Sequence, residues 1–378
     1  MPEGVCDDKI TLFRDYRMLY AEVDNMKVGI IGTVGSGKTT LFNALTGMSV
    51  RTGAGGRKTN LAVVKVPDER LDNVAQAVES EKVVHAEISF SDVAGGLGKP
   101  TREKGIEPKL LNLMSAEEAF AMVVADFEGY GGADESEADP MAQARELESD
   151  LALADLVVID NKLERMAKEN ATGIERDALD KCRAHLEEEQ PLRTLELNQG
   201  EAKALSSYGF LSLKKGVLIR NIGEEKLGEA APAGIEDFVA SRGLRQMSVA
   251  AKLEMEIAQM DPEERGEYAQ AMGLEGFALE NFIKQAFNAL DLISFFTIAG
   301  PSKEAHAWNI KRGSPAIEAA GRVHTDMQRG FIKAEVVAFE DWRQYGGEAG
   351  ARQAGKLRLE GKEYVVQDGD IIQFRFNV

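Results

Sequence analysis

The chain has 378 residues and a formal net charge of −18 at pH 7. This length predicts two to three domains, because a domain usually holds ~100–200 residues. With 44% hydrophobic and 29% charged residues, the composition is that of a soluble globular protein. Charge interrupts every apolar stretch before the ~18 residues that a bilayer span requires, so we expect no membrane partner. The negative charge also argues against a general nucleic-acid coat protein, and we expect no DNA partner.

Residues 1–25 are polar and irregular, and we interpret them as an N-terminal extension without the pattern of a secretory signal. The two cysteines, Cys6 and Cys182, cannot form a disulfide scaffold or a CxxC metal site. We therefore expect a cytoplasmic protein. Residues 291–378 carry twelve basic and twelve acidic residues, so the C-terminal segment is the part least repelled by a polyanion such as RNA.

The first regular elements predict an α/β domain. Val28–Ile31 form a short apolar stretch typical of a buried strand, and the following helix is expected to end at Gly47. Strands alternating with helices are typical of a parallel sheet. Further strands are predicted at residues 61–66, 87–90, 121–125 and 216–219.

From about Pro140 the character changes, because apolar residues recur at near-heptad spacing on a charged background. We interpret residues 140–190 as two antiparallel helices inserted into the α/β domain and ending at Pro191. The end of the chain is rich in glycine and strand-forming residues and predicts a small α+β domain. Its last element is expected to be a hairpin of Val365–Val366 with Ile371–Phe376 around a Q-D-G-D turn.

A phosphate-binding loop is predicted near the start, where the sequence fits G-x-x-x-x-G-K-[ST] between strand and helix. Glycines let the backbone wrap a phosphate, and the helix N-terminus adds partial positive charge. Lys38 would meet the β- and γ-phosphates, and the Thr39 hydroxyl would ligate Mg²⁺. The alternative is a Gly-rich turn. The nucleotide-binding residues expected here are Gly32, Thr33, Val34, Gly35, Ser36, Gly37, Lys38, Thr39 and Thr40.

A D-x-x-G element begins at Asp92, directly after a predicted strand. Asp92 would hold Mg²⁺, usually through water, and the Gly95 N–H would approach the γ-phosphate. Between the two motifs, Thr59 is the candidate switch residue that closes over the metal and the γ-phosphate. Lys38, Thr59 and Gly95 are the candidate catalytic residues, and Thr39, Thr59 and Asp92 the candidate metal ligands.

The choice of base is expected to depend on a later loop. GTPases of this layout usually carry N-K-x-D, whose Asp accepts hydrogen bonds from guanine, but here the residues read N-I-G-E. Adenine has no 2-amino group, so a guanine-reading Asp would gain nothing. Asn221, Ile222 and Glu224 therefore indicate an apolar wall for adenine, with Ser248 and Ala250 on its other side; the alternative is an ordinary helix-start loop.

In this order the motifs resemble the Obg-like ATPase family (YchF) over about residues 26–378. The segments AAGRVHTDMQRGFIKAEV and VQDGDIIQFRFNV are similar to the family's TGS domain, a ubiquitin-like β-grasp. The resemblance implies an α/β fold, with a TRAFAC-class P-loop NTPase sheet, an inserted antiparallel coiled-coil hairpin and a C-terminal TGS domain. It also implies ribosome association and a preference for ATP over GTP. The expected domains are residues 26–139 with 201–290, 140–200, and 291–378.

The chain departs from the family pattern at the residues that bear on hydrolysis. The family's loop commonly reads G-L-P-N-V-G-K-S, and the Asn often linked to a potassium ion is Gly35 here. Gly96 stands where Ras-like enzymes carry the catalytic Gln, and Leu97 follows it. GKPTREKGIEPKL replaces the usual Gly-rich switch stretch. These departures concern hydrolysis rate, potassium stimulation and switch coupling rather than nucleotide binding.

Other residue types predict structure rather than chemistry. The four histidines show no ligand spacing, so we expect no metal besides nucleotide-bound Mg²⁺. Trp308 and the Phe295–Phe296 pair are interpreted as β-grasp core, and Cys182 as an inert thiol.

Two functions remain open from the sequence. The first is a monomeric ATP-binding switch that contacts the ribosome through its large subunit or rRNA. Its ATP hydrolysis is expected to be slow, because no side chain is placed to orient the attacking water. The second is a non-catalytic module in which nucleotide only stabilises the fold, while the hairpin and the C-terminal domain bind the ribosome or a protein.

Overall fold

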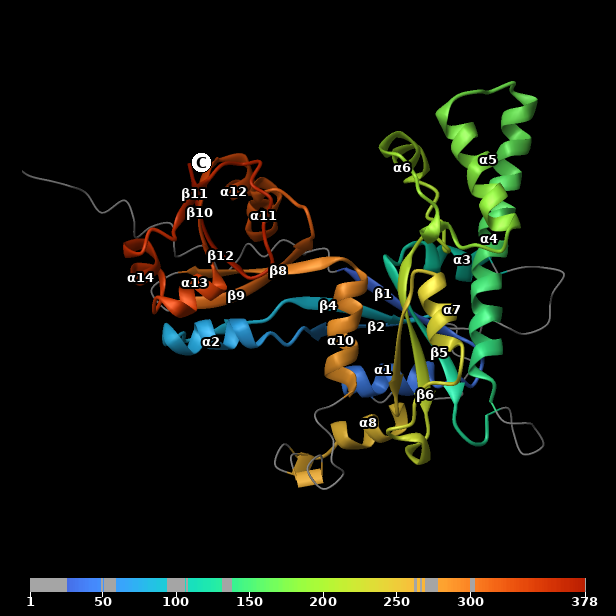
Figure 1. The fold of residues 1–378 in the computed structure, drawn as a ribbon, viewed down its shortest axis with the longest axis horizontal. Helices are drawn as coiled ribbons and strands as arrows, with labels where there is room; N and C mark the ends of the chain where they lie inside the picture. Colours follow the sequence, from blue (N-terminus) through green and yellow to red (C-terminus); the bar gives the residue numbers. More distant parts are fainter. Residues whose placement is uncertain are drawn as a thin grey trace, which may run out of the picture. The chain divides into compact units, whose positions relative to one another are not determined.

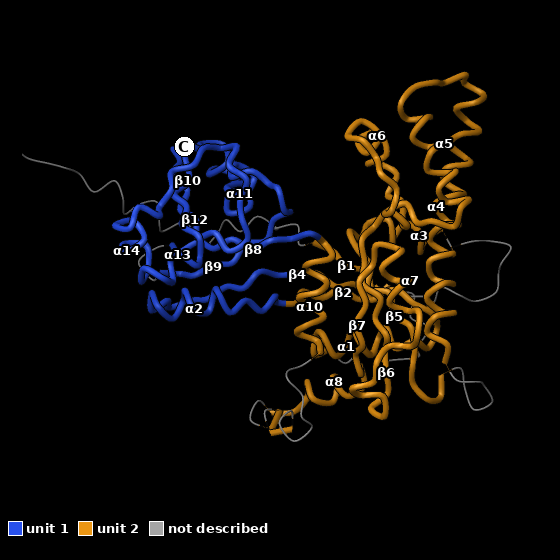
Figure 2. The backbone as a smooth tube through the Cα atoms, in the orientation of Figure 1, with its two compact units in different colours: residues 1–25, 65–87, 291–378 blue, residues 26–64, 88–290 orange. Residues whose placement is uncertain are grey.

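The computed structural model describes residues 26–48, 50, 59–93, 106, 108–130, 138–261, 264–265, 267–268, 278–299 and 303–377. The expected extension at 1–25 and Gly95 lie outside these residues. The chain divides into two compact units (Figure 2). In the described part, unit 1 comprises Lys65–Glu87 with the chain from Asp291 onward, and unit 2 comprises Met26–Val64 with Ile88–Leu290.

Unit 2 is built on a sheet with the strand order β2-β4-β1-β5-β6-β7 (Figure 1). The pairs β1–β4, β1–β5, β5–β6 and β6–β7 are parallel, which confirms the predicted α/β class. All residues of β5 are buried, as expected for an interior parallel strand covered on both faces. The strands are β1 Lys27–Gly32, β2 Asn60–Lys65, β4 Glu87–Asp92, β5 Ala119–Asp126, β6 Lys215–Ile222 and β7 Arg245–Val249.

Helices of unit 2 pack their apolar faces on this sheet. The first helix buries Leu41, Phe42 and Leu45, and it ends at Gly47 in the left-handed conformation, with φ 66°, as the sequence predicts. Of the helices in the described part of the chain, none combines the length and hydropathy of a membrane span. The helices are α1 Lys38–Thr46, α3 Pro108–Ser115, α7 Ile235–Ser241, α8 Ala251–Ala258 and α10 Ala278–Ala289.

The predicted helical hairpin is confirmed as α4 (Pro140–Lys168) and α5 (Ile174–Glu187), drawn in green in Figure 1. Two carboxylates of α4 are buried against the chain that returns from the hairpin. Asp155 accepts hydrogen bonds from the backbone N–H groups of Leu211 and Ser212 at 2.8 and 2.7 Å. Burial raises the pKa of Asp155 to about 6, although these hydrogen bonds favour the ionised form.

The second buried carboxylate of α4 belongs to Glu148, which forms an ion pair with Arg193. Arg193 lies in a 3-10 helix, η1 (Leu192–Thr194), that precedes α6 (Gln199–Leu205). Removing either partner of such a pair would leave an uncompensated buried charge. Both contacts therefore fix the base of the hairpin to the chain that follows it in unit 2.

Unit 1 has a separate mixed sheet in the order β11-β10-β12-β8-β9-β3, which confirms the predicted C-terminal α+β fold. Phe295 and Phe296 are fully buried, and Trp308 is nearly so, as expected for core residues. Its strands are β3 Val83–Val84, β8 Leu292–Ala299, β9 Glu304–Lys311, β10 Phe331–Ala338, β11 Arg358–Glu360 and β12 Asp370–Phe376. Its helices are α2 Glu69–Ala77, α11 Ala316–Val323, α12 Thr325–Arg329, α13 Phe339–Gln344 and α14 Glu348–Gln353.

The predicted terminal hairpin is wrong. Val365 forms an antiparallel bridge with Pro315, and the Val366 N–H donates to the carbonyl of Ser314 at 3.1 Å. β12 pairs instead with β10 and β8, so both of its edges are occupied. The buried Asp370 carboxylate accepts from the Gln367 N–H at 2.9 Å, which turns the chain sharply into β12.

Lys65–Glu87 groups with unit 1, whereas the sequence assigned it to the nucleotide-binding domain. β3 pairs in parallel with β9, which ties the segment to the C-terminal sheet. Arg70 on α2 donates two hydrogen bonds to Asp368, at 3.0 and 3.2 Å. A bidentate pair adds geometric specificity, and these residues lie 298 positions apart in sequence.

His306 should make unit 1 sensitive to acid. It stacks on Trp308 with ring centroids 3.8 Å apart, and burial lowers its pKa to about 4. The neighbouring charges of Glu304 and Lys82 act in opposite directions on this pKa. An unfolded imidazole has a pKa of ~6.5 and takes up the proton first, so stability should fall by about 2–3 kcal/mol as the pH drops from 6.5 towards 4.

Thermal melts of wild type and His306→Gln between pH 7.5 and 4.5 test this, because glutamine stays neutral throughout. The variant should lose less stability on acidification than wild type. His185→Gln, in unit 2, is the matched control and should leave the transition of unit 1 unchanged. Equal pH slopes for wild type and His306→Gln would contradict the prediction.

Candidate nucleotide-binding site

The expected phosphate loop lies between β1 and α1, at the carboxyl end of an interior strand. Gly35 and Gly37 have φ values of 85° and 92°, which L side chains rarely adopt. A Cβ at Gly37 would also lie 2.1 Å from Nδ2 of Asn221. The glycine at position 37 is therefore required both by the left-handed turn and by the close approach of the Asn221 amide.

Lys38 begins α1 and folds back over the loop. Its Nζ donates to the carbonyls of Gly32 at 3.0 Å and Thr33 at 2.7 Å. Burial lowers the pKa of Lys38 to about 8, and the negative charge of Asp92 opposes that shift. The ammonium is thus charged at neutral pH but poorly solvated, and a bound anion would stabilise its charge.

Oxygen ligands suited to a hard cation meet beside the loop. The Thr39 hydroxyl donates to Oδ2 of Asp92 at 3.0 Å, and Nδ2 of Asn60 lies 3.4 Å from the same oxygen. Next to Asn60, the Thr59 hydroxyl is buried and has no hydrogen-bond partner among the described residues. A carboxylate and a hydroxyl are ligands that Mg²⁺ accepts, so Asp92 and Thr39 fit the expected metal, while Thr59 is linked to them only as the chain neighbour of Asn60.

No group of three or more His, Cys, Asp and Glu side chains that could hold a metal occurs within the described ranges. Mg²⁺ is usually bound by one or two carboxylates together with substrate phosphates and water rather than by an all-protein cage. The single carboxylate of Asp92 beside the phosphate loop agrees with that mode. Gly95, the remaining candidate of the D-x-x-G element, falls in the part of the chain that the structure does not describe.

Asn221, at the end of β6, connects two loops of the site. Its Nδ2 donates to the carbonyl of Ser36 at 2.9 Å, and its Oδ1 accepts from the N–H of Ala251 at 3.1 Å. Ala250, predicted to line the base, directly precedes Ala251. The structure therefore brings Asn221, the phosphate loop and the Ala250 loop together.

The other candidate base residues lie in different surroundings. Ile222 is buried in an apolar cluster with Ala250, Leu253 and Ile257. Glu224 is exposed at the start of a 3-10 helix, η2 (Glu224–Lys226). The Ser248 hydroxyl lies 3.4 Å from Nη1 of Arg220. The backbone of the N-I-G-E segment is thus anchored at its first two residues, while the Glu224 side chain is open to solvent.

Sequence reasoning missed a cluster of charged residues that includes residues on either side of the N-I-G-E segment in the chain. Asp126, at the end of β5, pairs with Arg220, and Nζ of Lys226 lies 2.6 Å from its second oxygen. The hydrogen bonds and charges of these two cations lower the pKa of Asp126, outweighing its burial. An Arg directly before the Asn of the motif was the available signal, but its partner lies 94 positions earlier.

Two residues near Thr33 were also missed. The Thr33 hydroxyl lies 3.0 Å from the Tyr130 hydroxyl and 3.1 Å from Oε1 of Gln143. The Tyr130 ring lies 3.6 Å from the place of a Cβ at Gly35. Neither residue belongs to a recognisable motif, so no local pattern could have found them.

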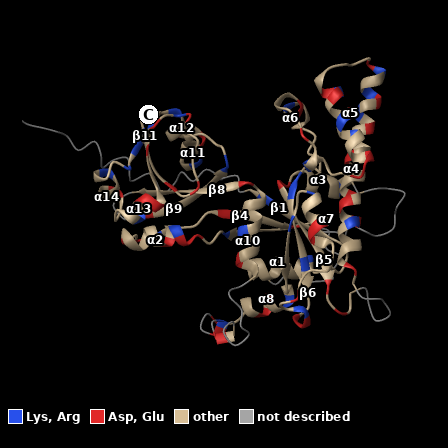
Figure 3. Cartoon of the chain, in the orientation of Figure 1, with Lys and Arg blue, Asp and Glu red and all other residues tan. Residues whose placement is uncertain are grey.

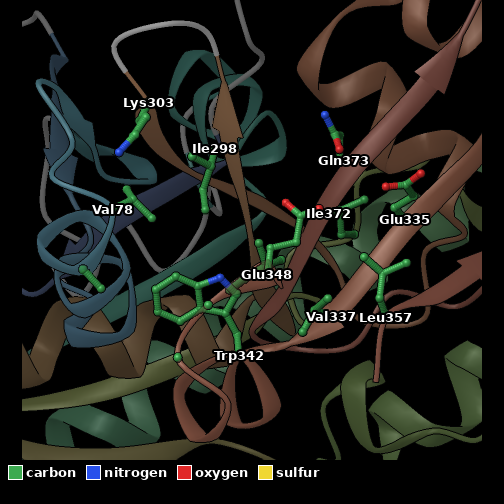
Figure 4. A pocket seen from close by; sticks show the side chains of 14 residues that line it. Val78, Ile298, Lys303, Glu335, Val337, Trp342, Glu348, Leu357, Ile372 and Gln373 are labelled. Carbon is green, nitrogen blue, oxygen red and sulfur yellow. The ribbon is translucent and has the colours of Figure 1, made fainter. Parts of the chain in front are cut away.

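A cavity of about 320 Å³ lies inside unit 1 (Figure 4). It is lined by apolar side chains such as Ile298 and Val337 and by the buried Trp342, whose indole N–H has no hydrogen-bond partner among the described residues. None of the expected nucleotide-binding residues lines it. The lining of the cavity therefore shares no residue with the phosphate loop.

The strand–loop–helix geometry, a desolvated lysine and a Thr–Asp pair at the strand ends define a P-loop nucleotide-binding protein. A family model described as "50S ribosome-binding GTPase" matches residues 27–176. A second, YchF-GTPase_C, described as "Protein of unknown function (DUF933)", matches residues 292–377.

Proteins called "Ribosome-binding ATPase YchF" are similar along almost the whole chain. The one from Haemophilus influenzae is 37% identical over 363 residues, covering 93% of this chain and 99% of that protein. The one from Bacillus subtilis is 34% identical, covering 93% and 100%. A solved structure described as the Schizosaccharomyces pombe YchF GTPase has a TM-score of 0.81 at 27% identity, covering 93% and 98%. The chain belongs to the YchF family.

Lys38→Ala should weaken binding of ATP with Mg²⁺ by about 100-fold, because it removes the ammonium that we expect to contact phosphate in a desolvated site. Lys27→Ala, on the exposed first residue of β1, is the matched control. Fluorescence titration with a labelled nucleotide measures both. An equal dissociation constant for Lys38→Ala and wild type would contradict the assignment of the loop.

Proposed function

We propose that the protein is a Mg²⁺-dependent ATPase of low turnover that acts as a nucleotide-controlled switch on the ribosome. The observation that carries this proposal is the loop at the end of β1, where Lys38 is desolvated while the Thr39 hydroxyl contacts Asp92. The names of the similar bacterial proteins support the ATPase activity and the ribosome contact.

In this proposal the loop residues 32–40 hold the triphosphate through backbone N–H groups, and Lys38 neutralises its charge. Thr39, Thr59 and Asp92 would hold Mg²⁺, which supplies charge stabilisation to the phosphates when bound. The orphaned Thr59 hydroxyl supports its role, because a buried hydroxyl without a partner is costly until a ligand satisfies it.

Slow turnover follows from the residues after Asp92. Glycine and leucine at positions 96 and 97 have no polar group that can orient an attacking water. Unassisted P-loop switches of this kind hydrolyse nucleotide at roughly 10⁻⁴–10⁻² per second. We expect a basal rate in that range, and a faster rate only when a partner completes the site.

Similar proteins are described both as ATPases and as GTPases, so their names do not decide which nucleotide is preferred. The preference for ATP is therefore proposed from the N-I-G-E segment. Guanine recognition by the N-K-x-D motif uses the short carboxylate side chain of its Asp and the Lys that follows its Asn. Ile222 and Glu224 supply neither, whereas Asn221 keeps its tie to the loop. ATP should therefore bind at least about tenfold more tightly than GTP, a difference of ~1.4 kcal/mol.

Side-by-side dissociation constants for ATP and GTP test this preference in wild type and in the double variant Ile222→Lys, Glu224→Asp. The double variant restores N-K-x-D and should shift the ratio of affinities towards GTP by about tenfold or more. Glu225→Asp, on the neighbouring exposed residue, is the matched control. Equal or GTP-favouring constants in wild type would refute the proposed base selection.

Ribosome binding is proposed to involve the large subunit, with the C-terminal unit and the hairpin as candidate contacts. Residues 291–378 are neutral overall in a chain of net charge −18. Both basic and acidic residues occur along α4 and α5 (Figure 3), so the hairpin is not a uniformly basic arm. Mixed charge favours a specific contact over non-specific phosphate binding.

Co-sedimentation with ribosomes, and with separated subunits, in ATP, ADP and no nucleotide tests the switch. Pelleting with the large subunit should differ at least about threefold between ATP and ADP, a modest coupling between sites. Lys38→Ala should show no such difference. If wild type pellets equally in all states and ribosomes do not change its phosphate release relative to Lys38→Ala, the protein is a non-catalytic binding module instead.

A further inference from the structure

The buried side chain of Gln143 continues the sheet where β1 ends. β1 pairs with β5 up to Gly32, which lies opposite Val123, and the chain then turns into the phosphate loop. Two residues further along β5, Ala125 bonds to Gln143 instead. The Ala125 N–H donates to Oε1 at 2.9 Å, and Nε2 donates to the Ala125 carbonyl at 2.9 Å. One side-chain amide thus replaces a backbone peptide of the missing strand.

This arrangement fixes the direction of both hydrogen bonds of the Thr33 hydroxyl. The Ala125 backbone permits only one orientation of the Gln143 amide, because a flipped amide would face donor to donor and acceptor to acceptor. Oε1 then accepts a second bond from the Thr33 hydroxyl, at 3.1 Å. Since that hydroxyl has one hydrogen, the Tyr130 hydroxyl must donate to Thr33, at 3.0 Å.

Thr33 also contacts the phosphate side of the loop through its backbone. Its carbonyl accepts from Nζ of Lys38 at 2.7 Å and from the Ser36 hydroxyl at 3.0 Å. A bound phosphate would compete for the Lys38 ammonium and so alter the bonds of this carbonyl. The hydroxyl of the same residue meets Gln143, so Thr33 joins the anion site to the far side of the loop.

Gln143 lies in the first turn of α4. The helix begins with Asp139 as its N-cap, whose carboxylate accepts from the Ala142 N–H at 2.9 Å, and continues without interruption to Lys168. The remaining donor of the Gln143 amide bonds to the Asp139 carbonyl at 3.2 Å. All four hydrogen-bonding positions of the amide are therefore occupied, so the side chain of Gln143 is held in one orientation on α4.

We propose that the Thr33–Gln143 hydrogen bond couples the phosphate loop to the inserted hairpin, so that nucleotide binding changes the stability of the first turns of α4. Gln143 is a positioning residue in this device, since it reaches the nucleotide only through Thr33. The proposal rests on nucleotide binding at the loop. Coupling is reciprocal, so a partner that grips the hairpin changes nucleotide affinity by the same factor.

Amide hydrogen exchange with and without saturating ADP or a non-hydrolysable ATP analogue tests the coupling. In wild type, exchange at residues 143–147 should slow by about fivefold when nucleotide binds. Thr33→Val keeps the loop backbone and removes the hydroxyl, so this slowing should disappear. Thr33→Ser restores the hydroxyl and should restore the slowing. Thr194→Val, which removes a hydroxyl at the base of the hairpin, is the matched control and should behave as wild type.

The outcomes separate this proposal from the proposed function. If wild type binds neither nucleotide, both are overturned. If wild type binds nucleotide but Thr33→Val keeps the slowing, or Thr33→Ser loses it as the valine variant does, the coupling is overturned and the function stands. If Thr33→Val does not bind nucleotide, Gln143→Leu gives the decision in the same way. Loss of binding in both variants would also overturn the coupling, because the pair would then belong to the nucleotide site itself.

Discussion

The buried amide of Asn221 is the contact on which the candidate site depends. It donates to the carbonyl of Ser36 and accepts from the N–H of Ala251, and so holds the phosphate loop at a fixed distance from the loop before α8. This close approach requires glycine at position 37, since any side chain there would collide with the Asn221 amide. A loop whose glycines could adopt many conformations is thereby held in one, which lowers the ordering cost of binding an anion.

Gln143 solves a related problem on the other side of the same loop. Parallel strands that end at different levels leave backbone groups of their neighbours without ladder partners, and such groups cannot be buried unpaired. At Ala125 a side-chain amide supplies both a donor and an acceptor in the place of a peptide. The two amides thus arise from one constraint: the phosphate loop must leave the sheet, and polar side chains must satisfy what it leaves behind.

The parts of the fold that were predicted from sequence are those coded by neighbouring residues. The strand, the glycine loop and the helix at Lys38 follow from spacing within a short segment, and the heptad-like pattern gives the hairpin. The transfer of Lys65–Glu87 to unit 1 was not predictable in this way, because it depends on Arg70 meeting Asp368 and on β3 pairing with β9. The Asp126–Arg220 pair escaped for the same reason. The prediction of a β-hairpin at the end of the chain was wrong, because turn residues indicate a turn but not which strands then pair.

In the chain, Lys65–Glu87 lies between the two edge-side strands β2 and β4, next to residues of the candidate metal site. Thr59 directly precedes β2 and Asp92 ends β4, and these neighbouring strands are the two connections through which the chain leaves unit 2 and returns to it. The segment that β3 ties to the C-terminal sheet is therefore joined at both ends to strands of the sheet in unit 2. The Thr33–Gln143 bond acts on α4 without involving either strand. Both paths begin at Lys38, whose ammonium donates to the Thr33 carbonyl and whose pKa is lowered by burial and raised, against that effect, by the charge of Asp92.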